Sequence, residues 1–376
     1  MQRTTPPFRV DHVGSLLRPP ELIAARDKFE AGDLDHDALA KEEDQAIKGV
    51  VALQEAIGLQ AITDGEYRRT SYLVDFVNGI EGVVANPREG EGWDYQSASG
   101  DGTTVPATRI GVSGKVSWPK GGILLNDFNY LKPLTSRTIK MTMPAPNQIY
   151  WFGGRDLISR DAYPDLGPFW DDLIAVYRAE IAALAAAGCR YIQIDETCLP
   201  KLSDPNMQDV LTKRGDDWRA LIEIFTDTMA RVAADPPDGV TIVMHHCRGN
   251  SRGHWQAEGS YEMVAENMFN RIPVAAHFLE YDSPRAGDFS PLRVVPDDKM
   301  IVLGLVSTKI PALESADDIK RRIGEASQYI PIERLCLSPQ CGFSSSHSGH
   351  PLTLDDQKRK IELMMSVADD VWGSGA

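Results

Sequence analysis

Short apolar runs rich in β-branched residues alternate along the chain with amphipathic stretches of helical period. Eight such runs can be counted, at 10–15, 61–66, 140–143, 189–195, 241–247, 274–281, 300–307 and 334–339. Several are apolar at nearly every position, which is typical of a strand buried on both faces of a parallel sheet. Helical stretches lie between most of them, at 169–187, 216–233, 261–270, 315–327 and 354–371. This alternation predicts an α/β fold, and eight units favour a closed (β/α)8 TIM barrel.

Two segments exceed what a minimal barrel needs. Helical patterns at 20–31 and 39–57 predict an N-terminal helical extension. Between 86 and 131, alternation at 103–118 and the Gly114-Lys115 pair predict a β-hairpin inserted after the second strand. No linker rich in Pro, Ser or Gly divides the sequence, so we expect one catalytic domain over residues 1–376.

Composition and charge narrow the class of partner. The chain carries 39 Lys and Arg against 54 Asp and Glu, a net charge of -15, which argues against nucleic acid and anionic lipid. No apolar run approaches the about 20 residues of a membrane span, and the N-terminus lacks the apolar core of a signal peptide. We therefore expect a cytoplasmic protein, either a monomer or a homo-oligomer. The five cysteines are few and odd in number, which predicts reduced thiols rather than disulfides.

Acids, histidines and cysteines gather where the predicted strands end. In a barrel of this kind, the working groups lie at the C-terminal ends of the strands and in the loops that follow. The residues at those ends are His12, Asp64, Glu66, Asp195, Glu196, His245, Cys247, Glu280, Asp282, Lys309 and Cys341. This clustering predicts an active site at one rim of the barrel.

The sharpest signal is the pair His245 and Cys247, two positions apart on a predicted strand. Residues i and i+2 of an extended segment point the same way, so both side chains can reach one ion. Imidazole and thiolate suit Zn2+, and further ligands can come from nearby strand ends, here Glu280 and Cys341. Four ligands scattered over a barrel mouth favour a catalytic zinc that faces a solvent cavity.

Each of these elements also has a plain structural interpretation. An isolated His-X-Cys pair is usually coincidental, and Glu66 in an Asp-Gly-Glu turn is usually a solvated carboxylate. We expect Cys189, Cys198 and Cys336 to serve only packing, and His246 to point away from the zinc ligands towards the barrel wall.

Six motifs, in order, resemble the catalytic half of cobalamin-independent methionine synthase. They are HVGS at 12–15, followed by Arg18 and Pro19; DGE at 64–66, followed by Arg68 and Arg69; YIQIDE at 191–196; HHC at 245–247; EYDS at 280–283; and PQCG at 339–342. The resemblance spans nearly the whole chain. The full-length enzymes also have an extra N-terminal barrel, to which no part of this sequence corresponds. It implies a zinc-dependent transfer of a methyl group to homocysteine, forming methionine, from a donor such as 5-methyltetrahydrofolate.

The resemblance also implies residue roles. Gly14 and Ser15 match the loop that holds the backbone of homocysteine, and Glu66 and Asp195 match the acids that bind its amino group; we also count Asp195 as catalytic. The ligands of the implied zinc are His245, Cys247, Glu280 and Cys341.

Two positions depart from the pattern of that family. Lys309 stands where the family commonly has a histidine proton donor, so it is either the catalytic acid or the partner of a carboxylate. Trp151 lies in a segment that replaces the family's TGP-type sequence, and it is either a stacking surface for a pterin or part of the barrel wall.

The chemistry that this set allows begins with the thiol. A free thiol with a pKa of about 8.5 is mostly protonated at neutral pH, and zinc binding converts it to the nucleophilic thiolate.

Three other functions are alternatives. The first is an epoxide:coenzyme M transferase on a similar barrel, but its substrate has no amino group for Glu66 and Asp195 to bind. A non-catalytic zinc or thiol-binding protein would keep four protein ligands. A decarboxylase of the uroporphyrinogen type would have no use for the cysteines.

Overall fold

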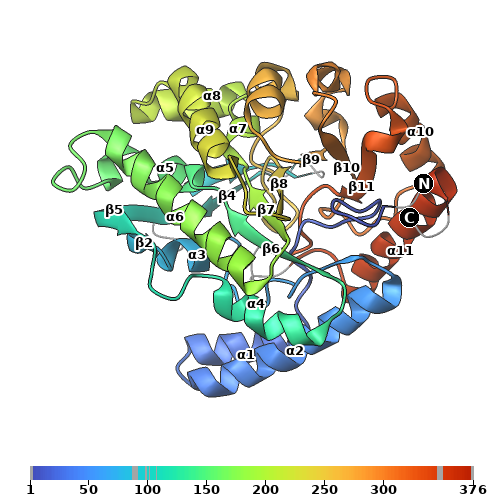
Figure 1. Cartoon of the computed structure of the whole chain (residues 1–376), viewed down its shortest axis with the longest axis horizontal. Coiled ribbons are helices and arrows are strands. Elements are labelled where there is room, and N and C mark those ends of the chain that lie inside the picture. Colours follow the sequence, from blue (N-terminus) through green and yellow to red (C-terminus); the bar gives the residue numbers. More distant parts are fainter. Residues whose placement is uncertain are drawn as a thin grey trace.

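The computed structural model describes residues 3–86, 92–97, 100, 102–106, 108–344 and 350–373. Its centre is a parallel sheet of seven strands in the order β1-β6-β7-β8-β9-β10-β11. These strands are β1 (Ala61–Ile62), β6 (Thr138–Pro144), β7 (Tyr191–Asp195), β8 (Thr241–His246), β9 (Ala276–Glu280), β10 (Met300–Val306) and β11 (Leu335–Pro339). The sheet curls and helices surround it (Figure 1), which makes a TIM-barrel-like α/β fold.

The prediction of a regular first strand at 10–15 is wrong. Val10 makes a single bridge with Leu337 of β11, and the His12 ring lies 3.3 Å from the carbonyl oxygen of Ala61 in β1. Buried Lys140 donates from Nζ to the carbonyl oxygen of His12 at 2.5 Å. The Lys140 side chain thus occupies a backbone carbonyl oxygen that would otherwise be free to accept a hydrogen bond from a neighbouring strand. The segment therefore lies between β11 and β1 without forming a ladder to both.

Helices form where the sequence pattern predicts them, with one exception. The helix α6 (Leu166–Ala187) ends at Gly188, whose φ of +108° is easily adopted by glycine and whose N–H closes the last turn. The predicted helix at 261–270 is instead a 3-10 turn, η3 (Tyr261–Met263), followed by a π-helix, η4 (Glu266–Arg271). The other α-helices are α1 (Pro20–Glu30), α2 (His36–Ile57), α3 (Val74–Asn78), α4 (Leu125–Leu131), α5 (Asn147–Gly153), α7 (Cys198–Lys201), α8 (Pro205–Arg214), α9 (Trp218–Ala233), α10 (Ala316–Ala326) and α11 (Leu354–Trp372). Among the described residues, no helix is long and apolar enough to span a membrane.

Two apolar clusters support the sheet. The larger one lies between the strands and the helices, and a smaller one fills the inside of the curled sheet. Val243 of β8 belongs to the inner cluster, so its i+2 neighbour His245 also faces inward. Cys336 is fully buried in the same inner cluster, in agreement with its predicted packing role. The inner packing thus forms the floor beneath the C-terminal rim.

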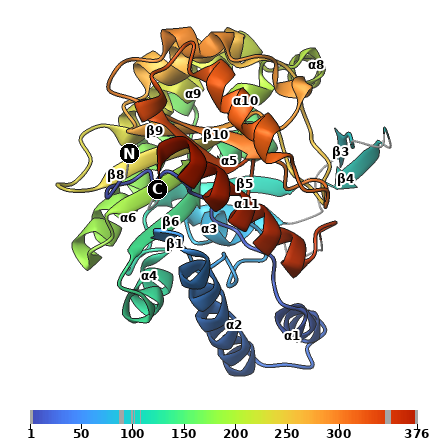
Figure 2. The same cartoon turned by 90° about the vertical axis from the view of Figure 1, so that its right-hand side faces the viewer.

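The insertion after β1 is a ribbon of two nested antiparallel pairs. The outer pair is β2 (Glu81–Asn86) with β5 (Arg109–Ser117), and the inner pair is β3 (Gly92–Tyr95) with β4 (Thr103–Pro106). Figure 2 shows β3 and β4 extending beyond the strands of the parallel sheet. The predicted turn at Gly114 and Lys115 is wrong, because both lie within β5. The register between β2 and β5 shifts opposite Gly82, so Gly114 and Lys115 lie at an irregularity in the ribbon rather than at its turn.

Candidate metal centre and substrate cavity

His245, Cys247 and Cys341 meet at the C-terminal rim of the sheet. Their ligand atoms all lie within 4.8 Å of one another, and the two sulfurs are 3.7 Å apart. Both ring nitrogens of His245 are buried and have no hydrogen-bond partner among the described residues. A buried imidazole without a partner is unfavourable, whereas one nitrogen and two sulfurs are a donor set that Zn2+ prefers. The three side chains therefore fit a zinc ion.

The two thiols of this cluster differ in their pKa. The hydrogen bond from Cys341 and the neighbouring His245 outweigh burial and hold the pKa of Cys247 well below its usual value. The same hydrogen bond, together with burial, raises the pKa of Cys341 well above its usual value. The N–H of Gly249 also donates to the Cys247 sulfur at 3.3 Å. Cys247 therefore loses its proton more readily than Cys341, even without a bound metal.

Glu280 ends β9 but is not a member of this three-residue group. Its Oε1 accepts from Lys309 Nζ at 3.0 Å and is ion-paired with Arg285, and its Oε2 accepts from the N–H of Arg248 at 2.6 Å. Burial favours the neutral acid, but the charges of Lys309, Arg285 and Arg248 prevail and lower the pKa of Glu280 far below its usual value. Glu280 is thus a buried anion, and Lys309 is the partner of a carboxylate.

A cavity of about 170 Å3 lies against the cluster. Its lining combines the three cluster residues with three of the predicted substrate-binding residues, Ser15, Glu66 and Asp195. Positions far apart in the sequence therefore face one small space, as the motif at each strand end predicts.

Two glycines allow the loops around this cavity to approach each other. A Cβ on Gly342 would lie 2.0 Å from Ser15 Oγ. Gly14 has a φ of +134°, and a Cβ there would lie 2.6 Å from Thr142 Cγ2 and 3.1 Å from Glu66 Oε1. Gly14 does not line the cavity itself, but its missing side chain leaves room for the Glu66 carboxylate.

Glu66 and Asp195 place two buried acids in the cavity. Glu66 Oε1 accepts from Thr142 Oγ1 at 2.6 Å, and Asp195 Oδ1 accepts from Gln193 Nε2 at 2.7 Å. Burial raises the pKa of Asp195 to about 7, and the nearby charge of Glu66 adds to this rise. Glu66 Oε1 also lies 3.3 Å from Arg69 Nη1. A cationic group placed beside Asp195 would stabilise the ionised form of that acid. The pair therefore fits an ammonium group.

Trp151 does not line the cavity. Its side chain is fully buried, and its ring stacks on Trp93 with the centroids 5.7 Å apart. Trp93 and Phe152 line the cavity in its place. Trp151 is therefore placed as part of the buried wall, rather than as a surface that faces the cavity. Trp93 could not be recognised as a lining residue from the sequence, because it lies in the inserted ribbon, where it is one apolar position among several.

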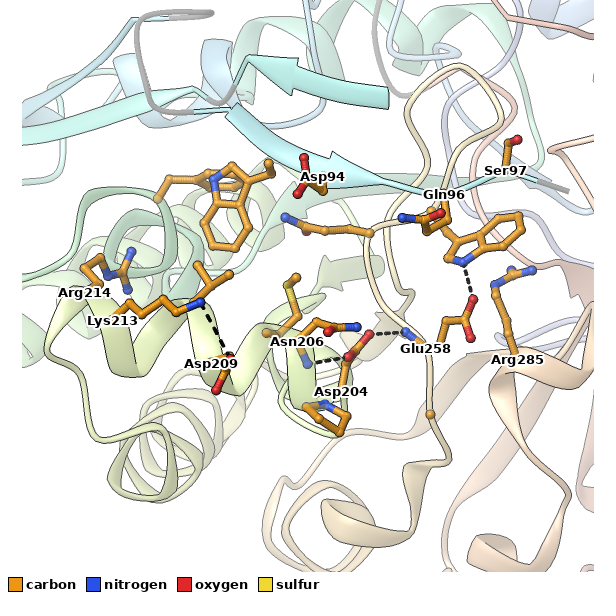
Figure 3. Close-up of a pocket in the computed structure, with 18 of the residues that line it drawn as sticks. Asp94, Gln96, Ser97, Asp204, Asn206, Asp209, Lys213, Arg214, Glu258 and Arg285 are labelled. Atoms are coloured by element: carbon orange, nitrogen blue, oxygen red, sulfur yellow. Dashed lines mark hydrogen bonds and ion pairs between the residues drawn. The ribbon is translucent and has the colours of Figure 1, made fainter. Parts of the chain in front are cut away.

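A larger cleft, of about 1590 Å3, adjoins this cavity through the shared residues Trp93 and Phe152. Figure 3 shows Asp94, Gln96 and Ser97 of the inserted ribbon on one side of the cleft. The opposite side carries Asp204, Asn206, Asp209, Lys213 and Arg214, and Glu258 and Arg285 lie near its other end. The cleft is large enough to hold a bulky second substrate beside the cavity.

Comparison with known proteins defines the class to which this fold and site belong. The family model described as "Cobalamin-independent synthase, Catalytic domain" matches residues 8–369, and the chain belongs to that family. The predicted resemblance is confirmed. Two Bacillus subtilis (strain 168) relatives are uncharacterised proteins. YxjH is 39% identical over 368 residues, covering 97% of this chain and 95% of the relative. YxjG is 37% identical over 376 residues, covering 99% and 97%.

A more distant relative has an assigned activity. The 5-methyltetrahydropteroyltriglutamate–homocysteine methyltransferase of Citrobacter koseri is 25% identical over 344 residues, which cover 90% of this chain but 41% of that enzyme. Among solved structures, a putative vitamin-B12 independent methionine synthase from Listeria monocytogenes matches with a TM-score of 0.76 and 30% identity, covering 99% of this chain and 100% of that one. A B12-independent methionine synthase from Shewanella sp. W3-18-1 shares the fold, with a TM-score of 0.71, 18% identity and 97% coverage of both chains.

Proposed function

We propose that this chain transfers a methyl group to the thiol sulfur of homocysteine, or of a similar small amino-acid thiol, with zinc as cofactor. The observation that carries the proposal is the unpartnered His245 beside the sulfurs of Cys247 and Cys341, in one cavity with the acids Glu66 and Asp195. Membership of the family supports methyl transfer. The proposed partners are the thiol and a methyl donor such as a methylfolate.

Each residue has a task in this proposal. His245, Cys247 and Cys341 hold the zinc, and Glu280 is the proposed fourth ligand, because a carboxylate has acceptor sites beyond the hydrogen bonds it already receives. Zinc at this position lowers the pKa of an incoming thiol, so that its sulfur is a nucleophile at neutral pH.

The amino-acid part of the substrate is held away from the cluster. Glu66 and Asp195 bind its ammonium, and the N–H group of Ser15, which lines the cavity, takes its carboxylate, while Gly14 leaves the room that Glu66 needs. With both ends fixed, the sulfur is directed at the cluster, and this positioning accounts for part of the rate.

The proposal is tested with purified, zinc-loaded protein, homocysteine and a panel of methyl donors. His245→Ala and Cys341→Ala are expected to lose zinc and methyl transfer together. Cys336→Ala is the matched control, because Cys336 lies in the inner core outside the cluster, and it is expected to lose neither. A Cys341→Ala protein with full zinc content would show that the ligand assignment is wrong.

The thiol is tested separately by calorimetric titration. Homocysteine is expected to bind more tightly than 2-mercaptoethanesulfonate, because only homocysteine carries the ammonium that Glu66 and Asp195 fit. The reverse order would favour an alkyltransferase that acts on a sulfonate thiol.

A further inference from the structure

Lys201 is a buried cation in the cavity to which neither the motifs nor the family assignment gives a role. It is the last residue of α7, the short helix that follows β7 and Asp195, and its side chain lines the cavity next to the cluster. Only 2% of Lys201 is exposed. Its Nζ lies 5.3 Å from the centre of the Trp151 ring.

Within the described part of the chain, Lys201 Nζ makes no hydrogen bond and no ion pair. The two nearest acids along the chain are occupied. The carboxylate of Asp204 accepts from the N–H groups of Asn206 and Glu258. That of Glu196 accepts from the N–H groups of Cys198 and Leu199 and from Asn147. A buried ammonium without an acceptor is unfavourable unless a ligand supplies one. The free Nζ therefore points to a ligand atom that carries negative charge or a lone pair.

The position of Lys201 indicates which ligand this is. In the proposed function the thiol substrate has other partners in this site, with acids for its ammonium and the N–H of Ser15 for its carboxylate. Lys201 lies on the part of the wall that includes Trp151, whose stacking partner Trp93 lines both the cavity and the larger cleft. Lys201 is therefore on the side of the cavity that adjoins the larger cleft, where a second substrate would have room.

We propose that Lys201 is the acid for the leaving group of the methyl donor, an inference that rests on the proposed function. In this step the thiolate sulfur uses its electron pair to form a bond to the methyl carbon. The bond from carbon to the leaving atom breaks, and its pair stays on that atom. A proton from Lys201 Nζ neutralises the leaving atom, and the lysine regains a proton from solvent.

Lys309, the acid expected from the family pattern, is less suited to this task. Its Nζ is 3.0 Å from Glu280 Oε1, and it is not among the residues that line the cavity. Burial, the largest influence, lowers the pKa of Lys201, so this ammonium releases its proton more readily than an exposed lysine does. The assignment also predicts the class of donor, because a donor whose leaving atom becomes basic needs this proton and an onium donor does not.

The test compares two small electrophiles with zinc-loaded protein and homocysteine. Ethylene oxide leaves an alkoxide that needs a proton, whereas methyl iodide leaves iodide, which does not. In Lys201→Met, the rate with ethylene oxide relative to that with methyl iodide is expected to fall about 100-fold or more, which is the usual contribution of a general acid. Lys201→Arg keeps the charge but is a far weaker acid, and it is expected to retain homocysteine affinity while showing the same loss.

The control is Lys358→Met, since Lys358 lies on α11, lines neither the cavity nor the cleft, and has a half-exposed side chain; its ratio of rates is expected to match the wild type. Zinc content and circular dichroism show whether each variant is folded and loaded. An unchanged ratio in a loaded Lys201→Met protein overturns the proposal. So does a selective loss of homocysteine affinity, because Lys201 would then anchor the thiol substrate. If the wild type does not accelerate alkylation by methyl iodide, the proposed function itself fails, and this inference fails with it.

Discussion

Replacement of Asp195 by asparagine is expected to weaken binding of the amino-acid substrate without loss of zinc. Asp195 Oδ1 accepts a 2.7 Å hydrogen bond from Gln193 Nε2, which the side-chain oxygen of asparagine can also accept, so the variant should fold. It loses the negative charge that fits the ammonium. A hydrogen bond to a charged group contributes about 1.5–3 kcal/mol, and at about 1.4 kcal/mol per factor of ten the affinity should fall about 10- to 150-fold.

The same residue predicts a pH dependence. Burial raises the pKa of Asp195 to about 7, so this carboxyl group is largely protonated below that pH in the ligand-free protein. Ammonium binding requires the ionised form. The affinity of the wild type is therefore expected to fall as the pH drops through about 7. The affinity of Asp195→Asn should stay low and nearly constant over the same range.

Calorimetric titration with methionine measures this effect, because the thioether has no thiol proton to lose and the titration of the thiol cannot contribute. Asp209→Asn is the matched control, since Asp209 lies on α8 in the larger cleft, and it is expected to bind methionine as the wild type does. The reasoning is refuted if Asp195→Asn binds methionine with wild-type affinity, or if it keeps the wild-type pH dependence.

Three further substitutions test other parts of the account. Gly342→Ala puts a Cβ 2.0 Å from Ser15 Oγ; we expect at least about tenfold weaker methionine binding by calorimetry, and a cost of about 1–3 kcal/mol in urea unfolding. Glu180→Gln changes a fully buried acceptor of the Trp118 Nε1–H and the Leu124 N–H; unfolding should become easier by about 1–3 kcal/mol while zinc affinity stays the same. Lys309→Met breaks the buried pair with Glu280; it should destabilise the protein by about 3–5 kcal/mol in the same unfolding assay, and a smaller loss than that of Glu180→Gln would contradict the pairing.

The parallel sheet and its chemical rim were predictable because they depend on local rules. Strand cores are continuously apolar, and residues two positions apart share a face, so His245 and Cys247 were expected to point together. Cys341 was expected to join them because parallel strands end at one rim. In agreement with the prediction, His246 points the other way and contacts His277 at 3.0 Å.

The features that the sequence did not predict depend on contacts between distant segments. At 10–15, Lys140 from another strand binds the His12 carbonyl oxygen, and no pattern within the segment itself reports that. The turn of the ribbon was misplaced because Gly114 and Lys115 look like a turn but lie at an irregularity of β5.

The two cations near the site were missed or left open for the same reason. Lys201 follows Cys-Leu-Pro in the sequence and resembles an exposed lysine at a helix end, and only the tertiary structure buries it against Trp151. Lys309 could equally be an acid or an ion-pair partner until the structure placed it 3.0 Å from Glu280.

The central claim is that His245, Cys247 and Cys341 hold a zinc ion that leaves a position for the sulfur of the substrate. X-ray absorption at the zinc edge, recorded on the loaded protein before and after homocysteine is added, tests it most directly. The account predicts two sulfur neighbours without substrate and a third, also at about 2.3 Å, with it. An unchanged sulfur shell at saturating homocysteine would contradict the account.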